Sequence, residues 1–453
     1  MKLPLEKVDG LQERDATRFL VAYSLRGGKR LPSFDELAGP VDAFDLGRFA
    51  GHYSADAGAG PRIFAASGCL GAQLSTDCAA GLPVESVQVF GICVRFSGYV
   101  ALLQFDAHVG LAEAVALLQQ TCFRRTSLTV DGKAIERLLV ELAPSSIRPV
   151  LEELSLDRDV YQLVLPGTQL IGELAEVSGD DLDYAEDLVM RLIYREDSVF
   201  RPGTGSMRAP AELNRPRRSL CRHGRGVTVL AGWPEHVEYA VALTAVELVS
   251  ATARLRKIRV DTVDALEIAQ TSAQAIQIGG ASGLSLARAT LAGLSRSLGD
   301  QELQLSFGVE AYLDNLRVPE IVLESYRESF AASLGLSQGV ATIGALLNRL
   351  KTVIEARTAV LTAAERRVSE IRRRGWEWAA AYISIVAIPF GLVLAFLGTS
   401  VQEVSPRRSL FDLHHYGWYY GAIFGVLLTA FVVFAVVRLV LSRSIPKVLS
   451  EVE

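Results

Sequence analysis

Cysteine is scarce in this chain of 453 residues. The five cysteines are widely spaced and odd in number, and no two of them form a CxxC pair. Such spacing favours neither a disulfide framework nor a zinc site. We therefore expect reduced thiols at Cys69, Cys78, Cys93, Cys122 and Cys221.

The chain also lacks the sequence motifs of several enzyme classes. It contains no Ser-His-Asp set, no HExxH sequence and no metal-ligand spacing. The GTGS sequence at residues 203–206 has no following lysine or helix, so it is not a phosphate-binding P-loop. We expect neither an enzyme nor a bound cofactor, except a divalent cation such as Mg²⁺ as a ligand.

A strong excess of one charge is missing as well. The formal net charge of −5 is too small to favour nucleic acid or an acidic partner. The N-terminal sequence MKLPLEKVDGLQERD has no apolar run after its lysine, which predicts that no secretory signal peptide is present.

Two long apolar segments near the C-terminus are the most informative feature that is present. They run from about Ala379 to Gly398 and from about Tyr419 to Leu441. Each holds roughly 20 residues with almost no charge, enough for a helix to cross a hydrocarbon core of ~30 Å. A membrane protein with a large extramembrane part explains why half of the residues are hydrophobic while 21% are charged. The alternative is a pair of buried helices in a soluble domain.

The flanking residues predict the orientation of these segments. Arginines are concentrated before the first segment, from Arg366 to Arg374, and Arg443 and Lys447 follow the second. The positive-inside rule places such residues in the cytoplasm, so both termini are expected there. Trp376 and Trp378 border the first segment, where aromatic rings favour the membrane interface. We predict a multi-pass protein of the cell membrane.

The extramembrane part divides into three regions. Residues 1–83 have weak periodicity and predict no clear element. Residues 84–232 alternate between strand and helix patterns and predict a cytoplasmic α/β domain. Residues 233–375 are mainly helical, and residues 376–453 form the membrane hairpin with a basic tail. Within the α/β domain we expect strands over Ser86–Phe96, Tyr99–His108, Val160–Leu165 and Val227–Leu230, helices over Ala112–Thr121 and Ala134–Leu142, and a long loop over Phe200–Gly226.

An apolar seam with heptad spacing precedes the first membrane segment. Its weaker positions are Arg357 and Ala364, and no proline lies between Pro319 and Pro389. The pattern predicts helices that pack side by side and one helix that continues from the cytoplasm into the membrane. The alternative is an amphipathic helix that folds back on its own domain. The seam consists of Leu336, Val340, Ile343, Leu347, Leu350, Ile354, Leu361, Val368 and Ile371.

Small residues recur on one face of the first apolar segment. Small side chains allow helix backbones to approach closely, and around a symmetry axis they would leave a narrow pore. Close packing and a pore are therefore both open interpretations of this face. The residues are Ala380, Ser384, Ala387, Gly391, Ala395 and Gly398.

The sequence IPFGLVLAFLGTS, from Ile388 to Ser400, closes the first apolar segment. Together with the predicted cytoplasmic domain and the long helix into the first of two spans, it resembles the CorA family of magnesium and divalent-cation channels. The family has a mid-span proline and then a Gly-Met-Asn motif at this place. Here Gly398 is followed by Thr399 and Ser400, so the motif is Gly-Thr-Ser.

The resemblance implies a function and a set of sites. It implies an α+β cytoplasmic domain, a stalk helix and a two-helix membrane hairpin, with five copies of the chain around a pore lined by the first span. Gly398, Thr399 and Ser400 would then hold a hydrated cation at the outer mouth. A ring of Glu403 and Asp412 would attract cations. A cluster of Asp180, Asp181 and Asp183 would bind a regulatory metal; a helix cap is the simpler interpretation of it.

Two functions therefore follow from the sequence. The first is a cation channel or transporter gated by its cytoplasmic domain, with Mg²⁺ selectivity weakened by the altered motif. The second is a membrane-anchored oligomeric sensor or effector, in which the cytoplasmic domain binds a small ligand or partner and no ion moves.

Overall fold

The computed structural model describes the greater part of the chain. The described residues are 14–27, 44–54, 60–68, 70–71, 73–77, 82–95, 97–178, 181–196, 219–278, 280–313 and 321–399, together with single residues and pairs between 414 and 439. They form two compact units: residues 1–261 with 300–346, and residues 262–299 with 347–453. Each unit is described by itself.

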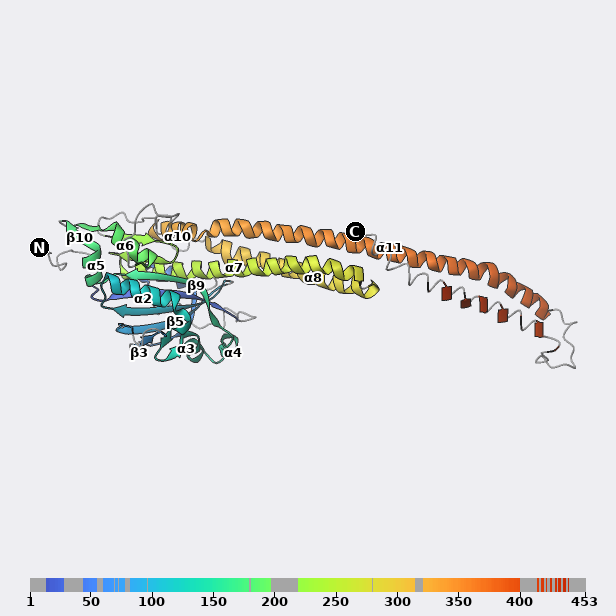
Figure 1. Cartoon of the computed structure of the whole chain (residues 1–453), viewed down its shortest axis with the longest axis horizontal. Helices are drawn as coiled ribbons and strands as arrows, with labels where there is room; N and C mark the ends of the chain where they lie inside the picture. Colours follow the sequence, from blue (N-terminus) through green and yellow to red (C-terminus); the bar gives the residue numbers. More distant parts are fainter. Residues whose placement is uncertain are drawn as a thin grey trace. The chain divides into compact units, whose positions relative to one another are not determined.

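An eight-stranded sheet forms the centre of the first unit (Figure 1). Neighbouring strands follow the order β12-β13-β9-β1-β6-β5-β2, and β3 pairs with β5. The strands of this sheet are β1 Thr17–Arg26, β2 Arg62–Ala66, β3 Leu70–Gly71, β5 Ser86–Val94, β6 Gly98–Ala107, β9 Ser155–Leu165, β12 Leu220–His223 and β13 Val227–Ala231. Two small sheets are made by β4 Leu74–Ser75, β7 Thr129–Val130 and β8 Lys133–Ala134, and by β10 Ala175–Ser178 and β11 Asp181–Tyr184.

The four central strands have the connectivity of a split βαβ unit. In chain order they are β1, β5, β6 and β9, and in the sheet they lie as β9-β1-β6-β5 with antiparallel neighbours. β13 extends the sheet in parallel to β9. The crossover from β9 to β13 carries helices, as a parallel pair requires.

Helices cover both faces of this sheet. The core on one face joins alternate β1 residues, such as Phe19 and Val21, to Val115 of α2 and Leu139 of α3. On the other face, Arg18 of β1 donates a hydrogen bond to the Tyr239 hydroxyl of α7 at 2.9 Å. The helices are α1 Ala50–Ser54, α2 Leu111–Phe123, α3 Ile135–Leu142, α4 Arg148–Leu151, α5 Thr168–Leu174, α6 Glu186–Tyr194, α7 Glu235–Ile278, α8 Gly280–Leu305, α9 Ala311–Leu313, α10 Ile321–Leu334 and α11 Leu336–Thr399, with short turns η3 Gly47–Phe49, η4 Arg125–Ser127 and a π-helical turn η5 Ser306–Glu310.

The second unit is helical. It contains the C-terminal part of α7, most of α8, and α11 from Leu347 onward. An ion pair of 3.8 Å joins Arg288 of α8 to Glu365 of α11. Apolar side chains of all three helices are buried, as expected for helices that pack along a seam. They are Ala265, Ala269, Leu284, Ala287, Leu291, Leu294, Leu298, Leu347, Leu350, Ile354, Leu361, Ala364 and Val368.

The structure confirms the α+β region and the long C-terminal helices that follow it. The strands expected over Ser86–Phe96 and Tyr99–His108 are β5 and β6, which pair as an antiparallel β-hairpin. The predicted stalk is α11, one helix of 64 residues. Two local predictions need correction. Leu220–His223 is a strand within the predicted loop, because it pairs with β13 at the sheet edge. Residues 1–83 also contribute β1 and β2 to the same sheet as the region that follows them.

Candidate functional site

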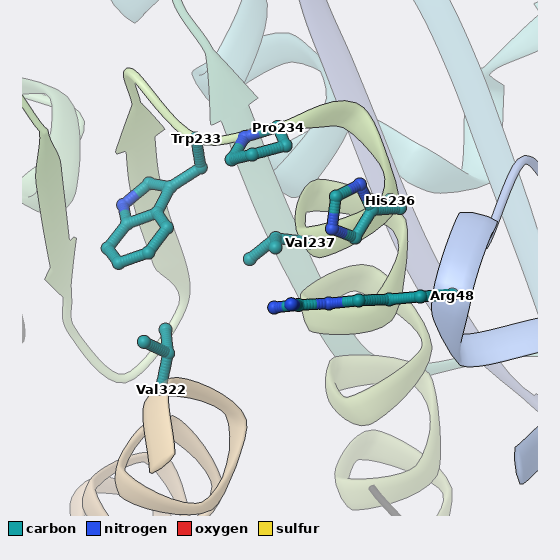
Figure 2. Close-up of a pocket in the computed structure, with 6 residues that line it drawn as sticks. All are labelled: Arg48, Trp233, Pro234, His236, Val237 and Val322. Atoms are coloured by element: carbon teal, nitrogen blue, oxygen red, sulfur yellow. The ribbon is translucent and has the colours of Figure 1, made fainter. Parts of the chain in front are cut away.

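A cavity of about 260 Å³ lies at the N-terminus of α7 (Figure 2). Three separate parts of the chain line it. They are η3 with Arg48, the junction of β13 and α7 with Trp233, Pro234, His236 and Val237, and the first turn of α10 with Val322. The side chains of Trp233 and Arg48 lie on opposite sides of the opening, and His236 lies beside Arg48. The lining residues are Arg48, Trp233, Pro234, His236, Val237 and Val322.

Backbone geometry brings η3 close to α7. Gly47 has a φ of +46°, and a Cβ atom at this position would lie 3.1 Å from the His236 Cβ atom. Glycine therefore suits both the left-handed backbone and the close approach. Phe49 then packs edge-on against the His236 ring, with centroids 5.2 Å apart. These contacts place Arg48 at the cavity.

Ion pairs engage the acidic side chains of the first turn of α7. Glu235 pairs with Arg18 at 3.1 Å, and Glu238 pairs with Arg14 at 2.9 Å. Burial raises the pKa of the Glu238 carboxyl, and the charge of Arg14 opposes this rise. No carboxylate is among the described residues that line the cavity.

The chemistry of the cavity fits a small anion with an apolar part. Arg48 supplies a cation and His236 an imidazole, while the N-terminus of α7 adds a dipole that favours negative charge. Trp233, Pro234, Val237 and Val322 supply apolar wall. Ligand sites commonly combine such walls with a few polar groups.

A buried polar cluster attaches α10 to the sheet. The Tyr161 hydroxyl lies 2.8 Å from Thr228 Oγ1, which lies 3.0 Å from the Tyr326 hydroxyl. His223 Nε2 lies 2.7 Å from the Ser329 hydroxyl. Burial lowers the pKa of His223 to about 4, so this imidazole is neutral near pH 7. The hydroxyl groups and His223 Nε2 satisfy one another in the interior, whereas His223 Nδ1 is buried without a hydrogen-bond partner among the described residues. The cluster therefore holds α10 against the sheet.

The structure places the predicted pore residues along one helix. Ala380, Ser384, Ala387, Gly391, Ala395, Gly398 and Thr399 all belong to α11, which ends at Thr399. Ala380, Ser384 and Gly391 are exposed. A Cβ atom on Gly391 would meet nothing within 4 Å in the part of the chain that the structure describes. Ser400, Glu403 and Asp412 lie outside the described residues.

The predicted regulatory metal residues lie at the β10–β11 hairpin. Asp181 and Asp183 belong to β11, and Asp180 lies outside the described residues. Asp183 is exposed and is the register partner of Glu176. Among the residues that the structure describes, no group of three or more His, Cys, Asp or Glu side chains is arranged to hold a metal ion.

Apolar side chains are exposed toward the C-terminus. Within the described residues no single helix has the length and hydropathy to cross a membrane, although the pair Val322–Leu334 and Leu336–Ala381, bent by 55°, passes the same test together. The described residues of the second apolar segment are helical. Exposed apolar residues in the two segments include Ile383, Ile388, Phe424, Leu428, Phe431, Val432, Val436 and Leu439.

Comparison with known proteins assigns no relative to this chain. No protein-family model, no curated protein and no solved structure matches it. The functional argument therefore rests on the residues and their geometry.

The cavity at α7 has no counterpart among the predicted sites. Its residues come from three distant parts of the chain, and the sequence around Arg48 has no motif. The one local signal is the Gly-Trp-Pro sequence at residues 232–234, since a proline next to the start of a helical pattern marks a helix N-terminus.

Proposed function

We propose that this chain is a two-span membrane protein of CorA-like plan that passes a cation through the membrane. The observation that carries the proposal is α11, which runs as one helix from Leu336 to Thr399. It joins a buried seam in its N-terminal half to the small-residue face that the sequence places in the membrane. A continuous helix transmits a displacement at one end to the other, which suits gating by the cytoplasmic domain.

Exposed side chains of the two apolar segments support the membrane placement. Ile388 is 58% exposed, and Phe424 and Phe431 are 66% and 69% exposed. Large apolar side chains that gather on such segments need lipid or protein to cover them. In this proposal the segments form a hairpin in the cell membrane, both termini are cytoplasmic, and copies of the chain surround a pore with Gly398, Thr399 and Ser400 at its outer mouth.

Ion flux tests this function. Full-length protein in liposomes that contain a Mg²⁺-sensitive dye is expected to admit Mg²⁺ faster than protein-free liposomes. Thr399→Met with Ser400→Asn would restore the family's motif and provide an amide oxygen that accepts hydrogen bonds from the cation's water shell. We expect this variant to raise the flux of Mg²⁺ relative to K⁺ several-fold. Liposomes that stay tight to both ions would rule out the channel.

The cavity at α7 favours a second function, that of a membrane-anchored sensor. Its cation, its helix N-terminus and its apolar wall suit a small organic anion, as described above. In this function the ligand would bind the cytoplasmic domain, and the membrane segments would anchor and assemble the chain without transporting an ion.

Binding of phenyl phosphate tests the sensor. We expect calorimetry on the full chain in detergent to give a dissociation constant below about 1 mM. Arg48→Ala should weaken binding at least tenfold, because a charge-assisted hydrogen bond to the phosphate is lost. Arg259→Ala, another exposed arginine, is the control. Inorganic phosphate, which has only the anionic group, and phenol, which has only the aromatic ring, should each bind more weakly than phenyl phosphate. If Arg48→Ala and Arg259→Ala bind phenyl phosphate equally well, this cavity is not the binding site.

A further inference from the structure

Five arginines form a basic surface on α11 just before the first apolar segment. All five are exposed, and so are Trp376 and Trp378, at 61% and 76%. Arg374 precedes Ala379 by five residues, which is roughly 8 Å along a helix. The juxtamembrane arginine surface comprises Arg366, Arg367, Arg372, Arg373 and Arg374.

The helix repeat gathers four of these arginines on one side. Seven residues are about two turns, so Arg373 lies nearly in line with Arg366, and Arg374 with Arg367. The buried residues Leu361, Ala364 and Val368 define the packing seam of the helix. On a helical wheel, Arg366 and Arg373 therefore lie opposite the chain's own packing seam, and Arg367 and Arg374 lie beside it. Arg372 lies closer to the seam and is exposed as well.

Few of these charges are compensated within the chain. Arg373 pairs with Glu377 at 2.8 Å. For the other four arginines, the part of the chain that the structure describes offers no ion-pair partner within 4.0 Å. Arg367 and Arg374 in particular place two guanidinium groups on the same side of the helix, about two turns apart.

We propose that the juxtamembrane arginine surface binds the headgroups of anionic phospholipids of the cytoplasmic leaflet. This inference rests on the proposed membrane placement and not on ion transport. Clusters of arginine next to a membrane helix attract anionic lipid, and guanidinium groups bind phosphate through paired hydrogen bonds. The exposed Trp376 and Trp378 then lie between the arginines and the hydrocarbon, where indole rings favour the interface. Long arginine side chains reach along the helix to the headgroups.

Lipid retention measured by native mass spectrometry tests this inference. Full-length protein is incubated in micelles with equal amounts of phosphatidylglycerol and phosphatidylcholine, then released from the micelles. We expect wild-type protein to retain phosphatidylglycerol at least fivefold over phosphatidylcholine. Arg367→Gln with Arg374→Gln should lower this ratio at least twofold. The matched control is Arg349→Gln with Lys351→Gln. It removes two exposed cations nearer the N-terminus of α11, farther from the apolar segment, and should leave the ratio unchanged.

Other results would overturn the inference. Equal retention of the two lipids by wild-type protein would do so, as would an equal loss in both variants. If Arg367→Gln with Arg374→Gln changes the oligomer mass but not the lipid ratio, the surface binds an acidic segment of a second copy. Flotation with phosphatidylcholine liposomes separates these failures from failure of the membrane placement: wild type and both variants should float, and protein that stays in the soluble fraction would overturn both proposals.

Discussion

Phe330→Ala is expected to destabilise the first unit by about 3–5 kcal/mol, the usual cost of removing a large buried aromatic side chain. Phe330 is fully buried in α10, and its ring lies 4.1 Å from Tyr161 and 5.5 Å from Tyr326, centroid to centroid. The substitution would leave a cavity where α10 meets β9 and would remove these ring contacts. The melting temperature of the full chain in detergent measures the loss.

Two further variants show whether the loss comes from this packing. Phe123→Ala deletes the same atoms from a residue that is 70% exposed, and it should change stability little. Tyr326→Phe keeps the ring and removes the hydroxyl 3.0 Å from Thr228, which should cost roughly 1–2 kcal/mol. If Phe330→Ala melts like Phe123→Ala, α10 does not depend on this cluster.

Gly391→Leu is expected to abolish cation flux or to dissociate the oligomer. Among the described residues, a Cβ atom at Gly391 meets nothing within 4 Å, so a leucine there clashes with none of them close to the backbone. In this proposal, a large effect would come from a neighbouring copy or from the pore. Overpacking of close helices costs roughly 1–3 kcal/mol per subunit, and a symmetric assembly repeats this cost in every copy. Oligomer mass and liposome flux are the measurements.

Val393→Leu provides the control for this prediction. It adds one methylene to the same helix, two residues away and off the small-residue face. We expect normal flux and an unchanged oligomer. If both variants behave like the wild-type protein, the small-residue face is turned toward lipid, and the assignment of Ala380, Ser384, Ala387, Gly391 and Ala395 to a pore is wrong.

The elements that sequence predicts well have strong local signals. The β5–β6 hairpin combines β-branched and aromatic runs with a Ser-Gly turn at residues 97–98, and Gly98 has a φ of +151°. Up to Ile388, the continuity of α11 follows from the heptad seam and from a run without proline, and the helix then continues through Pro389 to Thr399. In these cases neighbouring residues alone carry the information.

β1 shows why the N-terminal region could not be read from sequence. Its sequence, TRFLVAYSLR, is buried from Phe19 to Tyr23 on both faces of the sheet, so apolar and polar residues do not alternate. A central strand covered on both sides loses the period of two that identifies a half-exposed strand. Short apolar runs of this kind are ambiguous until their neighbours are known.

By itself, the sequence determined the order of the regions, the long helices and the two apolar segments, because periodicity and hydropathy are properties of contiguous residues. Only the tertiary structure decided that β1 lies between β6 and β9, and that Arg48, His236 and Val322 line one cavity. The physical reason is that these contacts join distant parts of the chain. Burial and close packing select them among many alternatives, and no local pattern records which residues will meet.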